Sequence, residues 1–186
     1  MSRFKSALLA AAVLLPVAGV AQAADYNPPA EQIDPTTMGM YLRGDLGASW
    51  LRSKNYAHDT GFAFSGGVGY QYTDYLRGEL AVDWSGKYKV APGVSLSTTA
   101  IMGNVYFDVK NDSMFTPYVG AGLGYGWVNG SGTGNNSGLA FGANAGVSVD
   151  LTTNLAVDVG YRFRDIAVKG PDPIEHQIMT GLRFKF

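Results

Sequence analysis

The chain has 186 residues, with 14 Lys and Arg against 15 Asp and Glu, and it contains no cysteine. This balance argues against nucleic acid as a partner, and the absence of cysteine excludes a disulfide framework. Residues 1–23 predict a secretory signal peptide. Arg3 and Lys5 precede an apolar run over 7–15, and the small-residue pattern Ala21-Gln22-Ala23 follows it as a cleavage site.

Residues 24–38 form a polar tract that holds Pro28, Pro29 and Pro35. Such a composition predicts an extended linker, which we expect in the periplasm once the chain has been exported. The remaining residues, 39–186, are enough for one domain. We expect no second domain after it.

Three ten-residue stretches, 41–50, 75–84 and 118–127, share one template and end in Trp50, Trp84 and Trp127, the only tryptophans of the chain. Apolar residues fall on every second position, which predicts β-strands with one apolar and one polar face. Ten residues at about 3.3 Å each, tilted by about 40°, rise roughly 25 Å, the height of the apolar band of an outer-membrane barrel.

The alternation extends over eight segments: 40–51, 62–72, 75–85, 97–109, 117–128, 139–150, 155–165 and 175–186. These predict an all-β fold, an eight-stranded antiparallel up-and-down transmembrane β-barrel. The connections over 73–74, 110–116 and 151–154 are tight. Those over 52–61, 86–95, 129–138 and 166–174 are longer and polar, which predicts four longer external loops and periplasmic termini.

The two faces of these strands differ in size as well as polarity. An eight-stranded barrel is only just wide enough for side chains, so the large aromatic face is expected to contact lipid and the smaller polar face to line the interior. A soluble barrel would reverse this. The lipid-facing parity predicts an aromatic girdle at each rim: Trp50, Trp84 and Trp127 at the external rim, and Tyr70, Tyr72, Phe184 and Phe186 at the periplasmic rim.

The leader, the alternating strands and the last segment, IMTGLRFKF, resemble the small outer-membrane β-barrels of the OmpA/OmpX type. The segments MYLRGDLGASW, TPYVGAGLGYGW and NLAVDVGYRFRD look more specifically like the opacity-type surface-antigen, or porin-family, branch. The resemblance implies an integral protein of the outer membrane. It also implies that Phe184 and Phe186 belong to an assembly signal read by the barrel-insertion machinery.

The inward parity carries a nearly balanced set of charges, which a narrow barrel must pair because an unpaired buried charge costs several kcal/mol. We predict an interior charge network in which Arg183 is the hub, reaching Asp45 and Asp158 from the last strand. Its members are Arg43, Asp45, Arg77, Glu79, Asp158 and Arg183. A salt-bridged interior is the favoured interpretation, and a gate or narrow pore remains the alternative.

Catalytic and metal sites are not expected, because the two histidines, His58 and His176, have no nucleophile of matched parity and form no ligand pattern. Tyr56, His58 and Tyr88 lie in predicted loops and are conceivable haem ligands, although solvated loop residues explain them as well. No cofactor is expected.

We therefore expect a structural role in envelope integrity and as a surface antigen. The alternatives are a narrow porin or a barrel that binds a small ligand such as haem and, third, a lipid A-modifying enzyme. The expected partners are outer-membrane lipid, lipopolysaccharide and the barrel-assembly machinery, for a protein that acts as a monomer.

Overall fold

Eight β-strands hold most of the residues that the computed structural model describes, which are 39–52, 59–91, 94–130, 134–168 and 173–186. The predicted signal peptide and linker, residues 1–23 and 24–38, lie outside these ranges, as do Tyr56 and His58. All eight predicted strands are confirmed. They are β1 (Gly39–Arg52), β2 (Asp59–Gln71), β3 (Leu76–Ala91), β4 (Val94–Asp108), β5 (Phe115–Gly130), β6 (Gly134–Asp150), β7 (Leu155–Ala167) and β8 (Ile174–Lys185).

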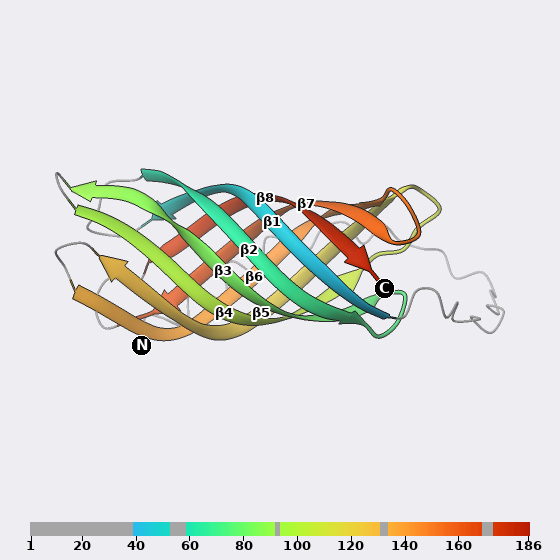
Figure 1. Ribbon diagram of the computed structural model, residues 1–186, viewed down its shortest axis with the longest axis horizontal. Coiled ribbons are helices and arrows are strands. Elements are labelled where there is room, and N and C mark those ends of the chain that lie inside the picture. The colour runs from blue at the N-terminus through green and yellow to red at the C-terminus, as the bar shows by residue number, and fades with distance from the viewer. Residues whose placement is uncertain (1–38, 53–58, 92–93, 131–133, 169–172) are drawn as a thin grey trace, which may run out of the picture. The chain divides into compact units, whose positions relative to one another are not determined.

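Every strand pairs antiparallel with its neighbours in sequence, and β1 pairs with β8 to close the barrel. Figure 1 shows the tilted strands running side by side around it. The closure seam extends from Tyr41 opposite Lys185 to Arg52 opposite Ile174. The amide of Phe186 donates to the carbonyl of Met40 at 3.0 Å, so both ends of the domain meet at one rim. We call this rim the terminal end and the opposite rim the distal end.

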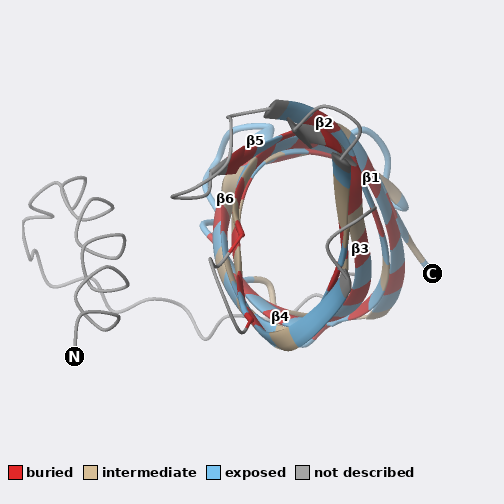
Figure 2. Cartoon of the chain, turned by 90° about the vertical axis from the view of Figure 1, so that its left-hand side faces the viewer, coloured by how far each residue is buried: buried red, intermediate tan, exposed pale blue. Residues whose placement is uncertain are grey.

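Exposure alternates along the strands, with one face buried in the lumen and the other turned outward, as the banding of Figure 2 shows. The outward face carries large apolar side chains: Leu46 is 60% exposed, whereas Ser49, of opposite parity, is fully buried. The predicted assignment of the two faces is therefore confirmed. No described residue belongs to a helix long and apolar enough to cross a membrane.

Two of the four predicted longer loops are instead strand for most of their length. β3 continues to Ala91 and β4 begins at Val94, while β5 continues to Gly130 and β6 begins at Gly134. Polar and glycine-rich sequence resembles a loop, but here it pairs across the sheet, with Gly130 opposite Gly134.

An irregularity in register between Gly86 and Tyr88 changes the parity of β3 near the distal end. A β-bulge of this kind redirects the side chains that follow it. Tyr88, predicted in a loop, is fully buried and donates a hydrogen bond to Ser49 inside the barrel.

Candidate functional site

The barrel interior gathers buried charged side chains from five strands, β1, β3, β4, β7 and β8, and it is the candidate functional site. All six predicted members of the interior network are buried, at 7% exposure or less. Five further charged residues of the same parity join them in the lumen: Asp83, Asp108, Arg162, Arg164 and Glu175. Lys185 and Asp150 pair at 3.1 Å with partly exposed side chains.

Arg43, on β1, makes three ion pairs in the half of the lumen nearer the terminal end. Its guanidinium lies 2.9 Å from Asp45, 3.5 Å from Asp158 and 3.8 Å from Glu79. Two tyrosine hydroxyls also donate to Glu79, from Tyr41 at 3.1 Å and Tyr106 at 3.2 Å. Arg43 therefore connects carboxylates from β1, β3 and β7.

The prediction that Arg183 is the hub is wrong. Among the ion pairs of the described residues, Arg183 makes one, with Asp158 at 3.4 Å, and it also donates to Ser148 at 2.6 Å. The register explains the difference: Arg183 lies directly opposite Arg43, whereas Asp45 lies opposite Gly181. The Nε of Arg43, on the same strand as Asp45, donates to that carboxylate instead.

A second set of ion pairs crosses the middle of the lumen. Arg162 on β7 contacts Asp83 on β3 at 2.7 Å and Asp45 on β1 at 3.4 Å. Arg162 also donates to Asn144 at 3.1 Å, and Arg164 lies 3.5 Å from Asp83. Because β3 and β7 are not neighbours in the sheet, these contacts tie opposite walls of the barrel together.

Glu175, on β8, organises the half nearer the distal end and was missed as a site residue. Its carboxylate accepts hydrogen bonds from Ser85 at 2.7 Å and Thr98 at 2.6 Å, and it pairs with Arg164 at 2.5 Å. It has the same parity as Arg183 on the last strand. The alternation of that strand was therefore a sufficient signal to place it inside.

Aromatic rings share the lumen with these charges, which the expectation of a small polar face did not include. The guanidinium of Arg77 lies 4.3 Å from the ring centre of Tyr106 and 4.9 Å from that of Tyr118. Arg77 also pairs with Asp108 at 3.0 Å. Its two terminal nitrogens make no hydrogen bond with a described residue, and they face aromatic surface that attracts cations.

An apolar cluster lines the lumen wall built by β4 to β7. Its buried members are Ala100, Met102, Val128, Ala140, Ile166 and Val168. Ile166 fills the space above Gly126, where an added Cβ would lie 2.8 Å from that side chain. Charged pairs, the edge-to-face rings of Tyr106 and Tyr118, and this cluster all occupy the lumen along the described strands.

The predicted girdle residues all lie on the outward face, and their role at a membrane interface stays a prediction. Trp50 and Trp127, each 38% exposed, lie close to the distal ends of β1 and β5, whereas Trp84 lies farther from the end of β3. Toward the terminal end are Tyr70, Tyr72, Phe184 and Phe186, each exposed by 40% or more. The assembly signal assigned to Phe184 and Phe186 likewise stays a prediction.

His176 points outward, where its Nδ1 lies 2.5 Å from the hydroxyl of Tyr161 and its ring contacts Phe163. Within the described ranges, no three His, Asp or Glu side chains are grouped so that they could hold a metal ion. The lumen is thus a set of paired charges, and its geometry suits cross-linking of the barrel walls.

The comparisons with known proteins identify the same architecture. A crystal structure of Neisserial surface protein A is similar with a TM-score of 0.72 and 25% identity, covering 80% of this chain and 97% of that one. The crystal structure of the Yersinia pestis attachment invasion locus protein Ail has a TM-score of 0.56 and 14% identity, and the match covers 78% of this chain and 99% of that one. OprG, an outer-membrane protein of Pseudomonas aeruginosa, has a TM-score of 0.51 and 14% identity, and the match covers 81% of this chain and 98% of that one.

An uncharacterized protein of Brucella abortus (strain 2308) is 26% identical over 196 aligned positions, which span 69% of this chain and 68% of that protein. The family model for the outer membrane protein beta-barrel domain matches residues 8–186. The protein is therefore located in the outer membrane, with its apolar face toward lipid. The chain belongs to the outer membrane protein beta-barrel domain family.

Proposed function

We propose that this protein is a closed, non-conducting barrel that contributes to envelope integrity and presents its distal end at the cell surface, where it acts as an antigen. The observation that carries the proposal is the filled lumen, whose eleven charged side chains are all at 7% exposure or less. A wide pore would leave such groups hydrated along a continuous water path.

Cross-lumen contacts support a mechanical role. Arg162 and Arg164 on β7 reach Asp83 on β3, and Glu175 on β8 accepts hydrogen bonds from Ser85 and Thr98. Contacts between non-neighbouring strands resist flattening of the barrel, because flattening would separate buried opposite charges. A rigid barrel of this kind is suited to holding surface segments at a fixed place in the membrane.

The similarity to Neisserial surface protein A supports the surface role, since that protein is named for its location and is 25% identical over most of this chain. We infer that the terminal end faces the periplasm and the distal end faces outward. Lipid, lipopolysaccharide and the barrel-assembly machinery are the partners that this orientation implies, and the paired lumen of one chain supports a monomer.

We also infer that the protein is not an enzyme. Ser85 lies beside the carboxylate of Glu175, but both residues are fully buried. Ser85 donates a hydrogen bond to Glu175 and accepts one from Arg164. His176, the histidine within the described ranges, is on the opposite face of the sheet. A serine nucleophile needs a base within hydrogen-bond reach and an accessible substrate position.

Planar-bilayer recording tests the closed lumen directly. The refolded barrel should give no sustained conductance, and Arg43→Ala should give a measurable leak, because it removes the side chain that joins three carboxylates. Lys185→Ala is the matched control, since it removes a cation from a partly exposed rim pair and should behave as the unmodified protein does. Large, steady conductance of the unmodified barrel would contradict the proposal and favour the porin alternative.

Deletion of the gene in the source bacterium tests the envelope role. We expect greater uptake of a hydrophobic dye and greater sensitivity to detergent, both restored by the unmodified gene. Surface location is tested by labelling intact cells with an antibody raised against the folded barrel. Deletion without any change in dye uptake or detergent sensitivity would leave the protein without an envelope role.

A further inference from the structure

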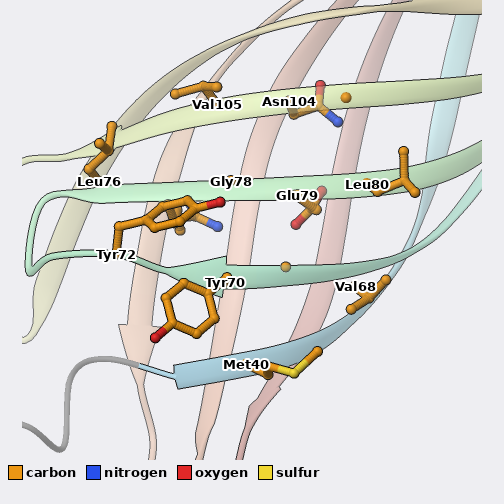
Figure 3. Close-up of a pocket in the computed structure, with 13 residues that line it drawn as sticks. Met40, Val68, Tyr70, Tyr72, Leu76, Gly78, Glu79, Leu80, Asn104 and Val105 are labelled. Atoms are coloured by element: carbon orange, nitrogen blue, oxygen red, sulfur yellow. The ribbon is translucent and has the colours of Figure 1, made fainter.

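The outer surface of the barrel is hollowed near the terminal end by a groove of about 580 Å³ that extends over β2, β3 and β4 and reaches Met40 of β1. Figure 3 shows the side chains that surround it. We call it the outer groove. Its lining also includes Arg77, Glu79 and Asn104, which are buried on the inward parity, so the outward apolar side chains form its exposed wall.

Glycines on the outward parity create the groove. Gly78 on β3 and Gly103 on β4 lie among its lining residues, and large neighbours, Val68, Leu80 and Val105, stand on the same face. These three side chains are between 40% and 57% exposed. Gly103 leaves an open position between these apolar side chains, whereas a ring from β2's end covers Gly78.

Two tyrosines mark the end of the groove that is nearer the rim. The rings of Tyr70 and Tyr72 have centres 5.0 Å apart, and the ring of Tyr72 lies across Gly78. Both side chains are 40% or more exposed. Tyrosine at a membrane interface places its ring in the apolar layer and its hydroxyl toward the headgroups.

We propose that the outer groove is a binding site for one glycerophospholipid of the surrounding leaflet, with an acyl chain in the groove and the ester and phosphate region at Tyr70 and Tyr72. The groove is continuous with the lipid-facing surface of an outer-membrane barrel, so the acyl chains of membrane lipids surround it. A chain inside it contacts Val68, Leu80 and Val105 at once, whereas a chain on a flat wall contacts one row. More carbon–carbon contacts favour the grooved position.

The occupant is a glycerophospholipid rather than lipopolysaccharide because the groove is at the terminal end, which the proposed orientation places in the periplasmic leaflet. The site itself does not depend on whether the lumen conducts ions. Conductance of the unmodified barrel would overturn the proposed function and leave this inference intact.

Photolabelling in vesicles tests the site. The refolded full-length mature chain is placed in phosphatidylethanolamine and phosphatidylglycerol vesicles that contain a small share of phosphatidylglycerol with a diazirine on one acyl chain. After irradiation, adducts are mapped by peptide mass spectrometry. Leu80 is compared with Val159, because both face outward four residues from the terminal end of their strands and are similarly exposed, at 57% and 51%.

Labelling at Leu80 should exceed that at Val159 by about threefold, the ratio that a handful of additional carbon–carbon contacts supports. Gly103→Leu fills the groove, and the new Cβ would have only the carbonyl oxygen of Leu123 nearby, at 3.7 Å. This variant should fold and lose the excess. Gly44→Leu, on the same outward parity with no atom within 4 Å of the new Cβ, is the matched control and should retain it.

Equal labelling of Leu80 and Val159 in the unmodified barrel would overturn the proposal, because the groove would then hold no lipid beyond the ordinary surrounding layer. Weaker labelling at Leu80 would also overturn it and would indicate another occupant. Recovery of that labelling on deletion of residues 24–38 would identify the linker, and its recovery when the barrel is diluted among more vesicles would identify a second copy.

Discussion

Single side chains in the lumen are stabilised by partners on strands far away in the sequence. Glu175 of β8 accepts hydrogen bonds from Ser85 of β3 and Thr98 of β4 and pairs with Arg164 of β7. A carboxylate removed from water needs such donors, since an unpaired buried charge costs several kcal/mol. At this scale, the lumen is stable because each charge has an opposite charge or a hydroxyl beside it.

Arg43→Ala should destabilise the barrel strongly. The substitution leaves Asp45, Asp158 and Glu79 without one of their cations, and breaking a buried pair on one side costs about 3–5 kcal/mol, or less where water enters. Urea unfolding of the refolded protein in vesicles measures this loss. Lys185→Ala should be within about 1 kcal/mol of the unmodified protein, because exposed pairs contribute little. Equal stability of both variants would contradict the network.

Leu46→Arg should impair insertion, because this outward side chain faces lipid and arginine near the bilayer midplane costs about 2–4 kcal/mol. Leu46→Ala is the control for lost side-chain volume and should insert. Heat-modifiable mobility on gels reports the folded fraction. Ser49→Arg is not a neutral comparison, since Ser49 is fully buried and hydrogen bonded to Tyr88. Normal insertion of Leu46→Arg would reverse the assignment of the two faces.

At the scale of a strand, β5 shows why glycine is frequent in this barrel. Gly120, Gly122, Gly124 and Gly126 occupy successive inward positions of β5, and side chains from β4 and β7 lie over them. Tyr106 of β4 covers Gly120, where an added Cβ would lie 2.5 Å from the ring. The glycines of β5 therefore leave space in the lumen, and side chains from β4 and β7 occupy that space.

Gly120→Val should destabilise the barrel by roughly 1–3 kcal/mol, the usual cost of forcing additional atoms into a packed interior. The new Cβ would collide with the ring of Tyr106 and lie 2.9 Å from the carbonyl oxygen of Val105. Gly66→Val is the matched control on the outward face, where no atom lies within 4 Å of the new Cβ, and it should fold normally. Denaturant midpoints compare the two, and a smaller loss for Gly120→Val than for Gly66→Val would exclude the proposed packing.

At the scale of the whole molecule, stability depends on closure, because no strand of the barrel keeps a free edge. β1 pairs with β8 over twelve residue pairs, and Phe186 continues the contact by donating to Met40. An open edge in lipid would leave backbone groups without hydrogen bonds, each at a cost of several kcal/mol. The last strand therefore determines whether all the others are stable in the membrane.

Phe186→Ala should reduce the yield of folded barrel in cells, because the terminal aromatic resembles the signal read by the insertion machinery. Deletion of Lys185 and Phe186 should reduce it further, since it also removes the hydrogen bond to Met40 and the pairing of Lys185 with Tyr41. Refolding of purified Phe186→Ala into vesicles should be close to normal, which separates recognition from stability. Unchanged yield in cells would remove the assembly role from Phe186.

The sequence by itself determined the strands, their number and their two faces. A period of two is a local property, and Trp50, Leu46 and Leu42 have one parity whichever strands lie beside them. The family followed from the same alternation together with the terminal segment. The inward position of Arg43, Asp45 and Arg183 was also readable from parity alone.

Only the tertiary structure decided which inward residues touch. Parity alone allowed an Arg183–Asp45 pair. The register across the closure seam places Arg183 opposite Arg43, and Asp45 forms its ion pairs with Arg43 and Arg162. The register shift beyond Gly86 turned Tyr88 inward, and the continued pairing of β3 with β4 made strand of a predicted loop. Contacts across a lumen depend on the stagger of all eight strands at once, which is a property of the closed barrel and not of any one segment.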